Sequence, residues 1–196
     1  MNDMLQWITD LTPLNRVFCS DGYDQAVDYF SQILPMTVHE FTESGHNGWE
    51  IPPHWDVQQA TIHKHGQLVW DGGGHPLGVI ALSAPYEGRV ELEELKKHLH
   101  YDLRFPDAVP FHFRQMYRPW SRNWGFCLPK NVHDSLTPGM YDVCIKTREK
   151  PGVLKIPEFV KPGESPVTFF FVAHLDHPGM SNDDLAGCAV GVELMR

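Results

Sequence analysis

The hydrophobic pattern of the first fifty residues predicts two amphipathic helices. The apolar residues of the first helix recur at the three- and four-residue spacing of one helix face: Met4, Leu5, Ile8 and Leu11. A second apolar stripe runs through residues 23–34, where Ser20 is placed to cap the first turn and Pro35 to end the helix. A short strand is expected at 36–41.

The middle of the chain has the shorter runs that are typical of β structure. Strands are predicted at four places: 57–63, 77–83, 126–128 and 140–146. One helix is expected among them, over 90–100, with Val90, Leu92, Leu95 and Leu99 facing inward. We therefore expect three segments: a helical part at 1–52, a β-rich part at 53–150 and a final part at 151–196.

The final segment contains the longest apolar run of the chain, Val167–Ala173. Its length and its bulky side chains predict a strand that is covered on both faces, as in an α/β sheet. A loop over 174–182 follows, and Asp183 and Asp184 then open a helix. Gly187 and Gly191 lie four residues apart in that helix, so that one face could press closely against the sheet.

The composition and charge of the chain argue against a nucleic-acid-binding protein and against a membrane protein. The 196 residues carry 16 basic and 25 acidic side chains, a formal charge of −9, without the basic patch of a nucleic-acid binder. No apolar run approaches the roughly 20 residues needed to span a bilayer, and no secretory signal opens the chain. The four cysteines form no CxxC pair. We expect a cytoplasmic protein with reduced thiols and neither nucleic-acid nor membrane partners.

The candidate chemistry lies directly after the apolar run. Four side chains that can ligate a metal fall within ten residues: His174, Asp176, His177 and Asp183. The carboxyl ends of the strands are where open α/β sheets bind ligands. Imidazole nitrogens and carboxylate oxygens together suit zinc, manganese or cobalt. The alternative is that the histidines are ordinary loop residues and the aspartates cap the helix.

Two motifs resemble those of known metallopeptidases. His174-Leu175-Asp176 followed by Asn182-Asp183-Asp184-Leu185-Ala186-Gly187 is similar to the H-x-D and N-D-[ND]-x-[SA]-G signature of co-catalytic zinc aminopeptidases. Residues 177–187 more closely resemble the H-P-S-x-A-N-D-N-L-S-G motif of a bacterial aminopeptidase-like family that carries an inserted domain. The stretches Trp49–Trp55 and Trp124–Leu128 also resemble that family.

This resemblance implies an α/β fold and a two-metal site. The expected fold is a partial three-layer, phosphorylase/hydrolase-like peptidase domain, which a β-rich α+β insert interrupts. Asp183 is the carboxylate expected to bridge the metals, and the complete protein would hold one or two zinc ions. The aminopeptidase pattern assigns the histidine ligand to His174 with Asp176 behind it, whereas the closer family favours His177. The general-base glutamate and the other ligands are expected beyond Arg196, so no catalytic residue is assigned and we expect a truncated, inactive chain.

Two functions follow as hypotheses. The first is a metal-dependent aminopeptidase-like hydrolase that acts on a peptide or amide bond. The second is a non-catalytic module that binds a peptide or a saccharide, for which four tryptophans would form an aromatic platform unless they pack a core: Trp49, Trp55, Trp120 and Trp124. Because the apolar strand would be poorly covered, we also expect low solubility or a homo-oligomer.

Overall fold

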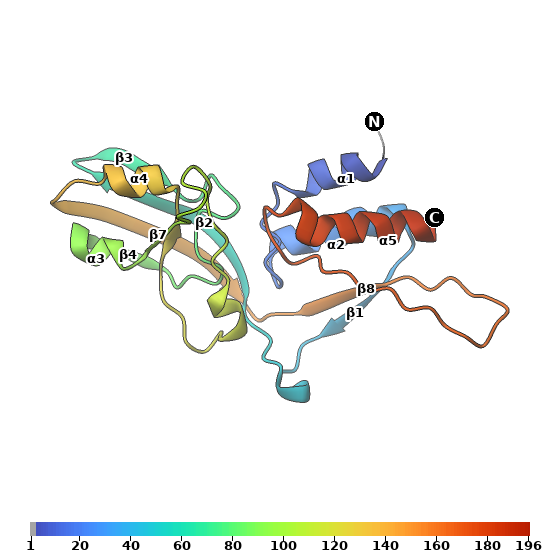
Figure 1. Cartoon of the computed structure of the whole chain (residues 1–196). Coiled ribbons are helices and arrows are strands. Elements are labelled where there is room, and N and C mark those ends of the chain that lie inside the picture. The colour runs from blue at the N-terminus through green and yellow to red at the C-terminus, as the bar shows by residue number, and fades with distance from the viewer. Residues whose placement is uncertain (1–2) are drawn as a thin grey trace. The chain divides into compact units, whose positions relative to one another are not determined.

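The structure, a computed structural model, describes residues 3–196 apart from the side chain of His46, and it divides the chain into two compact units (Figure 1). The first unit joins the chain up to Glu43 with Gly152–Arg196. The second unit is formed by Ser44–Pro151. The two ends of the sequence therefore build one unit, and the middle of the sequence folds as the other.

Three helices form the core of the first unit: α1 (Asp3–Leu11), α2 (Asp21–Ile33) and α5 (Gly187–Met195). As predicted, the Ser20 hydroxyl caps α2 by accepting the Tyr23 N–H at 3.1 Å, and the helix ends before Pro35. The buried apolar side chains of these helices belong to one cluster with Leu175 and Leu185. Leu5 is a correction: it is 55% exposed, because Trp7 occupies the buried face of α1 instead.

A two-stranded antiparallel sheet completes the first unit. Strand β1 (Thr37–Phe41) pairs with β8 (Leu154–Glu158), and the register places His39 opposite Ile156. Tyr23 of α2 donates its hydroxyl hydrogen to the Lys155 carbonyl at 2.9 Å. The helices and the sheet of this unit are therefore tied together by a buried side chain as well as by apolar packing.

The apolar run Val167–Ala173 does not form the expected strand. Its residues have no regular secondary structure, and Figure 1 shows them within a long excursion between β8 and the end of the chain. Phe169 and Phe170 are 80% and 81% exposed. A strand needs a neighbour to satisfy its N–H and C=O groups, and none of the described strands pairs with this run. The expected contact of Gly191 with a sheet is also missing, because nothing lies within 4 Å of the place where its Cβ would be.

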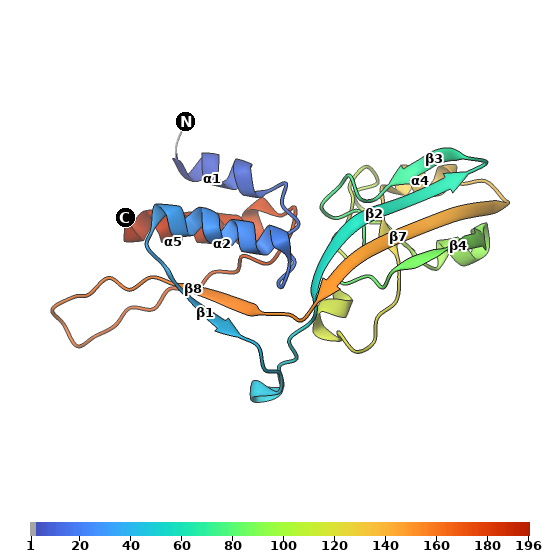
Figure 2. The ribbon, with the colours of Figure 1, turned by 180° about the vertical axis from the view of Figure 1, so that it is seen from behind.

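A four-stranded antiparallel sheet organises the second unit, with the strand order β3-β2-β7-β4 (Figure 2). Its long central strands are β2 (His54–Lys64) and β7 (Met140–Lys150), flanked by β3 (Gln67–Asp71) and β4 (Tyr86–Glu91). The predicted strands at 57–63 and 140–146 are confirmed within β2 and β7. Alternate residues of β7 are buried, as the period-2 pattern requires: Tyr141, Val143 and Ile145.

Smaller elements complete this unit, and two predictions fail among them. They are η1 (His46–Gly48), α3 (Leu92–Lys96), β5 (Leu99–His100), η2 (Arg114–Tyr117), β6 (Phe126–Cys127) and α4 (Lys130–Ser135). The helix expected over 90–100 is reduced to α3, because Val90 pairs with Tyr141 in the sheet. Residues 77–83 are buried but form turns with a single bridge, Val79 to Phe126, instead of a strand. None of the helices among the residues described is long and apolar enough to cross a membrane.

Candidate metal centre

The candidate ligands lie on the connection that enters the last helices of the first unit. After Asp176 the chain turns at His177–Met180, where the Met180 N–H bonds to the His177 carbonyl at 3.4 Å. Gly179 has a φ of 67°, a left-handed conformation that favours glycine at this point. The helical segment η3 (Ser181–Ala186) follows and continues into α5. The turn therefore folds Asp183 back toward His177.

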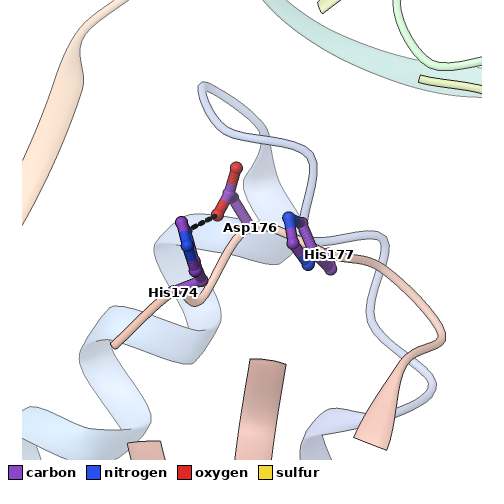
Figure 3. A group of neighbouring side chains, drawn as sticks. All are labelled: His174, Asp176 and His177. Atoms are coloured by element: carbon purple, nitrogen blue, oxygen red, sulfur yellow. Dashed lines mark ion pairs between the residues drawn. The ribbon is translucent and has the colours of Figure 1, made fainter. Parts of the chain in front are cut away.

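Three of the predicted ligands form one cluster. The ligating atoms of His174, Asp176 and His177 all lie within 4.8 Å of one another (Figure 3). His174 Nδ1 is 3.6 Å from Asp176 Oδ1, and the two imidazole rings are stacked with their centroids 5.3 Å apart. The side chain of Asp176 projects between the two rings in this view. The structure thus places a carboxylate and two imidazoles where they face a common volume.

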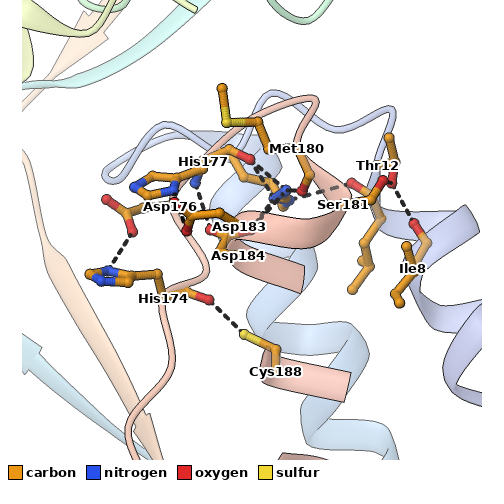
Figure 4. Close-up of polar contacts among 12 residues, drawn as sticks. Ile8, Thr12, His174, Asp176, His177, Met180, Ser181, Asp183, Asp184 and Cys188 are labelled. Carbon is orange, nitrogen blue, oxygen red and sulfur yellow. Dashed lines mark hydrogen bonds and ion pairs between the residues drawn. The ribbon is translucent and has the colours of Figure 1, made fainter. Parts of the chain in front are cut away.

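Asp183 contacts the same cluster through His177. Its Oδ1 lies 3.1 Å from His177 Nδ1 (Figure 4), and its side chain is 72% exposed. The backbone of Asp183 is not helical, with φ −110° and ψ 91°, although the residues around it belong to η3. This local break in the helix directs the carboxylate of Asp183 to His177 and leaves it open to solvent. Such π-type irregularities are frequent at functional sites.

Donor chemistry and spacing fit a zinc ion. Zinc takes nitrogen and carboxylate ligands at about 2.0–2.2 Å, so neighbouring ligand atoms of a tetrahedral site lie roughly 3.3 Å apart. The pairs His177–Asp183 and His174–Asp176 are separated by 3.1 and 3.6 Å, close to that edge length. Within each pair, small side-chain movements would therefore suffice to bring both ligand atoms onto one ion. The histidines of the two pairs differ in solvent exposure: the side chain of His174 is 73% exposed and that of His177 is 20% exposed.

The buried side chain of Arg16 holds the turn His177–Met180 in place. The guanidinium of Arg16 donates to the carbonyl oxygens of His177 and Met180 at 2.6 and 3.1 Å. It also pairs with the carboxylate of Asp184 at 3.1 Å, and both side chains are fully buried. The other oxygen of Asp184 accepts the His177 N–H at 2.7 Å. One ion pair thus fixes both ends of the turn that contains the candidate ligands.

The electrostatics of this ion pair are those of a buried site. Burial raises the pKa of Asp184, while the guanidinium of Arg16 and the His177 N–H oppose that rise. Burial likewise lowers the pKa of Arg16, which the charge of Asp184 counteracts. Each group therefore needs the other to stay ionised at low cost. The stretch Leu14-Asn15-Arg16 also resembles the aminopeptidase-like family, but no local pattern predicts a role for Arg16, because its partner Asp184 is 168 positions away in the chain.

Cys188 contacts the backbone of the ligand cluster. Its thiol donates to the His174 carbonyl at 2.7 Å (Figure 4). Burial raises the pKa of Cys188 to about 12, so the sulfur remains protonated at neutral pH. Cys188 therefore holds the backbone of His174 through this hydrogen bond. Glu193, farther along α5, pairs with Arg196 at 3.3 Å and lies on the surface.

The four tryptophans of the proposed aromatic platform separate into two pairs within the second unit. Trp55 is 1% exposed and donates its indole N–H to the Ser83 carbonyl at 3.0 Å. Trp124 is also buried, stacked between His98 and Tyr86 with centroid distances of 3.6 and 4.1 Å. Trp49 and Trp120, in contrast, are 60% and 70% exposed. Only the second pair is available to a ligand.

Three comparisons relate this chain to known proteins. Residues 54–148, nearly all of the second unit, match a family model described as "Domain of unknown function (DUF2172)". Over 186 residues the chain is 29% identical to a Clostridium acetobutylicum protein named "Putative polysaccharide biosynthesis protein with aminopeptidase-like domain". A crystal structure of a putative peptidase from the same organism superposes with a TM-score of 0.88 at 27% identity, over 98% of this chain.

Both relatives are longer than this chain. The chain spans 42% of the length of the curated relative and 45% of the crystallised one. The mixed α/β fold is shared with the crystallised protein. The names of the relatives link the fold to peptidases and to aminopeptidase-like domains.

Proposed function

We propose that this chain provides part of the metal site of a zinc-dependent, aminopeptidase-like hydrolase. The observation that carries the proposal is the pairing of His177 with Asp183 across a turn, with His174 and Asp176 facing the same volume. The resemblance of residues 174–187 to aminopeptidase motifs and the peptidase-like names of two relatives support it. The expected reaction is hydrolysis of an N-terminal peptide bond or a related amide.

The side chains have distinct tasks in this proposal. Asp183 and His177 are the inner ligands, since their separation of 3.1 Å is shorter than the 3.6 Å between His174 and Asp176 and Asp183 is open to solvent. His174 is either a further ligand or, with Asp176 behind it, the alternative histidine. A zinc ion held there would polarise the scissile carbonyl and lower the pKa of a bound water. Arg16 and Asp184 hold the backbone of the ligand loop and contact no substrate.

Metal binding by the chain itself tests the proposal, because it requires only residues present here. The protein is freed of metal with EDTA and titrated with zinc by calorimetry, and with cobalt by visible absorption. We expect binding that Asp183→Ala abolishes. Asp28→Ala, which removes an exposed carboxylate from α2, is the matched control and should bind zinc like the wild type. Unchanged zinc binding by Asp183→Ala would show that the proposed site is wrong.

A further inference from the structure

The two exposed tryptophans of the second unit lie at one shallow pocket. Trp49 and Trp120 line it together with Tyr117, Asn47 and Glu50, and its volume is about 230 Å³. All of its lining residues belong to the second unit. Large aromatic side chains that remain exposed around a concave surface are characteristic of binding sites, since solvent exposure of such rings costs stability.

Local structure holds both tryptophans in place. Trp49 follows a tight turn in which its carbonyl accepts the Gly45 N–H at 2.6 Å, and Gly48 adopts a φ of 81°. Trp120 lies in a second turn, closed by the Ser121 N–H and the Arg118 carbonyl at 2.9 Å. The rings are thus presented by two hydrogen-bonded turns instead of by free chain.

The segment before Trp120 is anchored in the interior. Met116 is 4% exposed, and the side-chain amide of Gln115 is buried. Gln115 donates to the Ala81 carbonyl at 3.3 Å and accepts the Asn123 N–H, so it bridges both sides of the turn. An exposed aromatic residue on so well anchored a turn loses little conformational entropy when a ligand covers it.

We infer that this pocket binds a sugar ring of a neutral saccharide. The C–H face of a pyranose is apolar and flat enough to lie on an indole, and covering both surfaces releases water. The hydroxyls at the edge of the sugar ring need donors and acceptors, which the amide of Asn47 and the carboxylate of Glu50 provide at the same pocket. The shallow, open shape suits one ring of a longer chain.

Charge and exposure argue against anionic and cationic ligands. The lining residues described contain one carboxylate, Glu50, and no lysine or arginine, which disfavours phosphate, sulfate or uronate groups. A cation would be attracted to Glu50 and to the aromatic faces. Cation–π attraction is weak where water reaches the rings, however, and Trp49 and Trp120 are mostly exposed. A neutral sugar gains from the apolar contact and keeps its outer hydroxyls in water.

The test is a titration of the full chain with neutral hexasaccharides of glucose and of N-acetylglucosamine. Calorimetry measures affinity, and tryptophan fluorescence reports whether the indoles leave water. The buffer contains EDTA, so that the result does not depend on the proposed metal site. We expect a dissociation constant of about 1 mM or below for at least one of the two sugars. Trp120→Ala and Trp49→Ala should each weaken binding about tenfold, and Trp120→Phe should weaken it less.

Controls separate the pocket from exposed aromatic surface in general. Phe105→Ala removes an aromatic side chain of the same unit that is 60% exposed but does not line the pocket, and it should bind sugar like the wild type. The inference would be overturned if neither hexasaccharide binds, or if both tryptophan variants keep the wild-type affinity. Tryptophan-dependent binding of tetramethylammonium without any binding of sugar would overturn it as well, since it would identify a cation site.

Discussion

The guanidinium of Arg16 and the carboxylate of Asp184 form an ion pair in which both side chains are fully buried, with Nη2 and Oδ1 3.1 Å apart. The two residues are 168 positions apart in the sequence. Through the carbonyl and the N–H of His177, this pair fixes the turn that holds the candidate metal ligands. Stability and metal binding should therefore respond together when it is broken.

Arg16→Met should destabilise the protein by about 3–5 kcal/mol, because it leaves the buried carboxylate of Asp184 without its counter-charge. Zinc affinity should fall in the same variant, since the carbonyls of His177 and Met180 lose their donor. Urea unfolding and zinc calorimetry measure the two effects. The double variant Arg16→Met/Asp184→Leu should recover part of the stability. A loss below about 1 kcal/mol in the single variant would contradict this role of Arg16.

His177→Ala should reduce zinc affinity more than His174→Ala does. His177 lies 3.1 Å from Asp183 and is mostly buried, so its loss removes a held ligand. His174 is exposed and pairs with Asp176. Its removal should lower zinc affinity about 10- to 100-fold, as is typical of residues that orient metal ligands. Calorimetry of the two variants side by side decides the assignment. The reverse order would assign the inner imidazole to His174.

Stability of the second unit should fall as the pH is lowered from about 6.5 to 4. Burial, aided by the neighbouring His112, lowers the pKa of His100 from its ordinary 6.5 to about 4. Between these values the unfolded chain binds a proton that the folded chain excludes. The stabilisation is therefore complete above pH 6.5 and is lost on acidification. It amounts to about 1–2 kcal/mol once the partial exposure of the ring is allowed for.

His100→Phe should flatten this pH dependence, because its ring cannot be charged. Urea unfolding at several pH values measures the slope for both proteins. His65→Asn is the matched control: His65 is exposed and has a φ of 50°, which asparagine tolerates. The control should keep the wild-type slope. An unchanged slope in His100→Phe would mean that this imidazole is not what makes the fold sensitive to acid.

Gly22→Ala and Gly191→Ala should have opposite effects, although both replace a helical glycine. A Cβ at Gly22 would overlap the carbonyl oxygen of Asn15, which is backbone and cannot rotate away, so a loss of about 1–3 kcal/mol is expected. Nothing lies within 4 Å of a Cβ at Gly191 in α5. Alanine there should stabilise the helix by about 0.5–1 kcal/mol. Thermal unfolding of both variants provides the measurement, and the same sign for both would contradict the packing at Gly22.

The exposed apolar run should cause self-association that depends on concentration. Phe169, Phe170 and Val172 are 80%, 81% and 79% exposed, and extended apolar chain with unpaired backbone groups readily pairs with another copy. Phe169→Ser/Phe170→Ser should shift sedimentation velocity profiles toward the monomer. Phe105→Ser, which removes one exposed phenyl ring outside the apolar run, should leave them unchanged. A wild-type protein that is monomeric at every concentration tested would refute this expectation.

Local signals were sufficient for several elements. The cap by Ser20 and the stop at Pro35 bound α2 as predicted, because these interactions involve residues a few positions apart. Alternation along 140–146 also correctly assigned the buried face of β7. Where burial depended on distant segments, the same patterns misled. Residues 77–83 are buried as turns against β6, and Val167–Ala173 is as apolar as a central strand yet has no partner strand among the described elements.

At the candidate site, too, the residues close together in sequence could be predicted, whereas the contacts between distant residues could not. The candidate ligands could be selected from the sequence, because His174, Asp176, His177 and Asp183 lie within ten residues of one another and the chain cannot separate them far. Tertiary structure decided that Asp183 leaves the helical conformation to face His177, and that Arg16 holds the loop. It also decided which tryptophans are buried and which are exposed. A buried charge or an exposed ring is defined by residues far away in the chain, and no local pattern contains them.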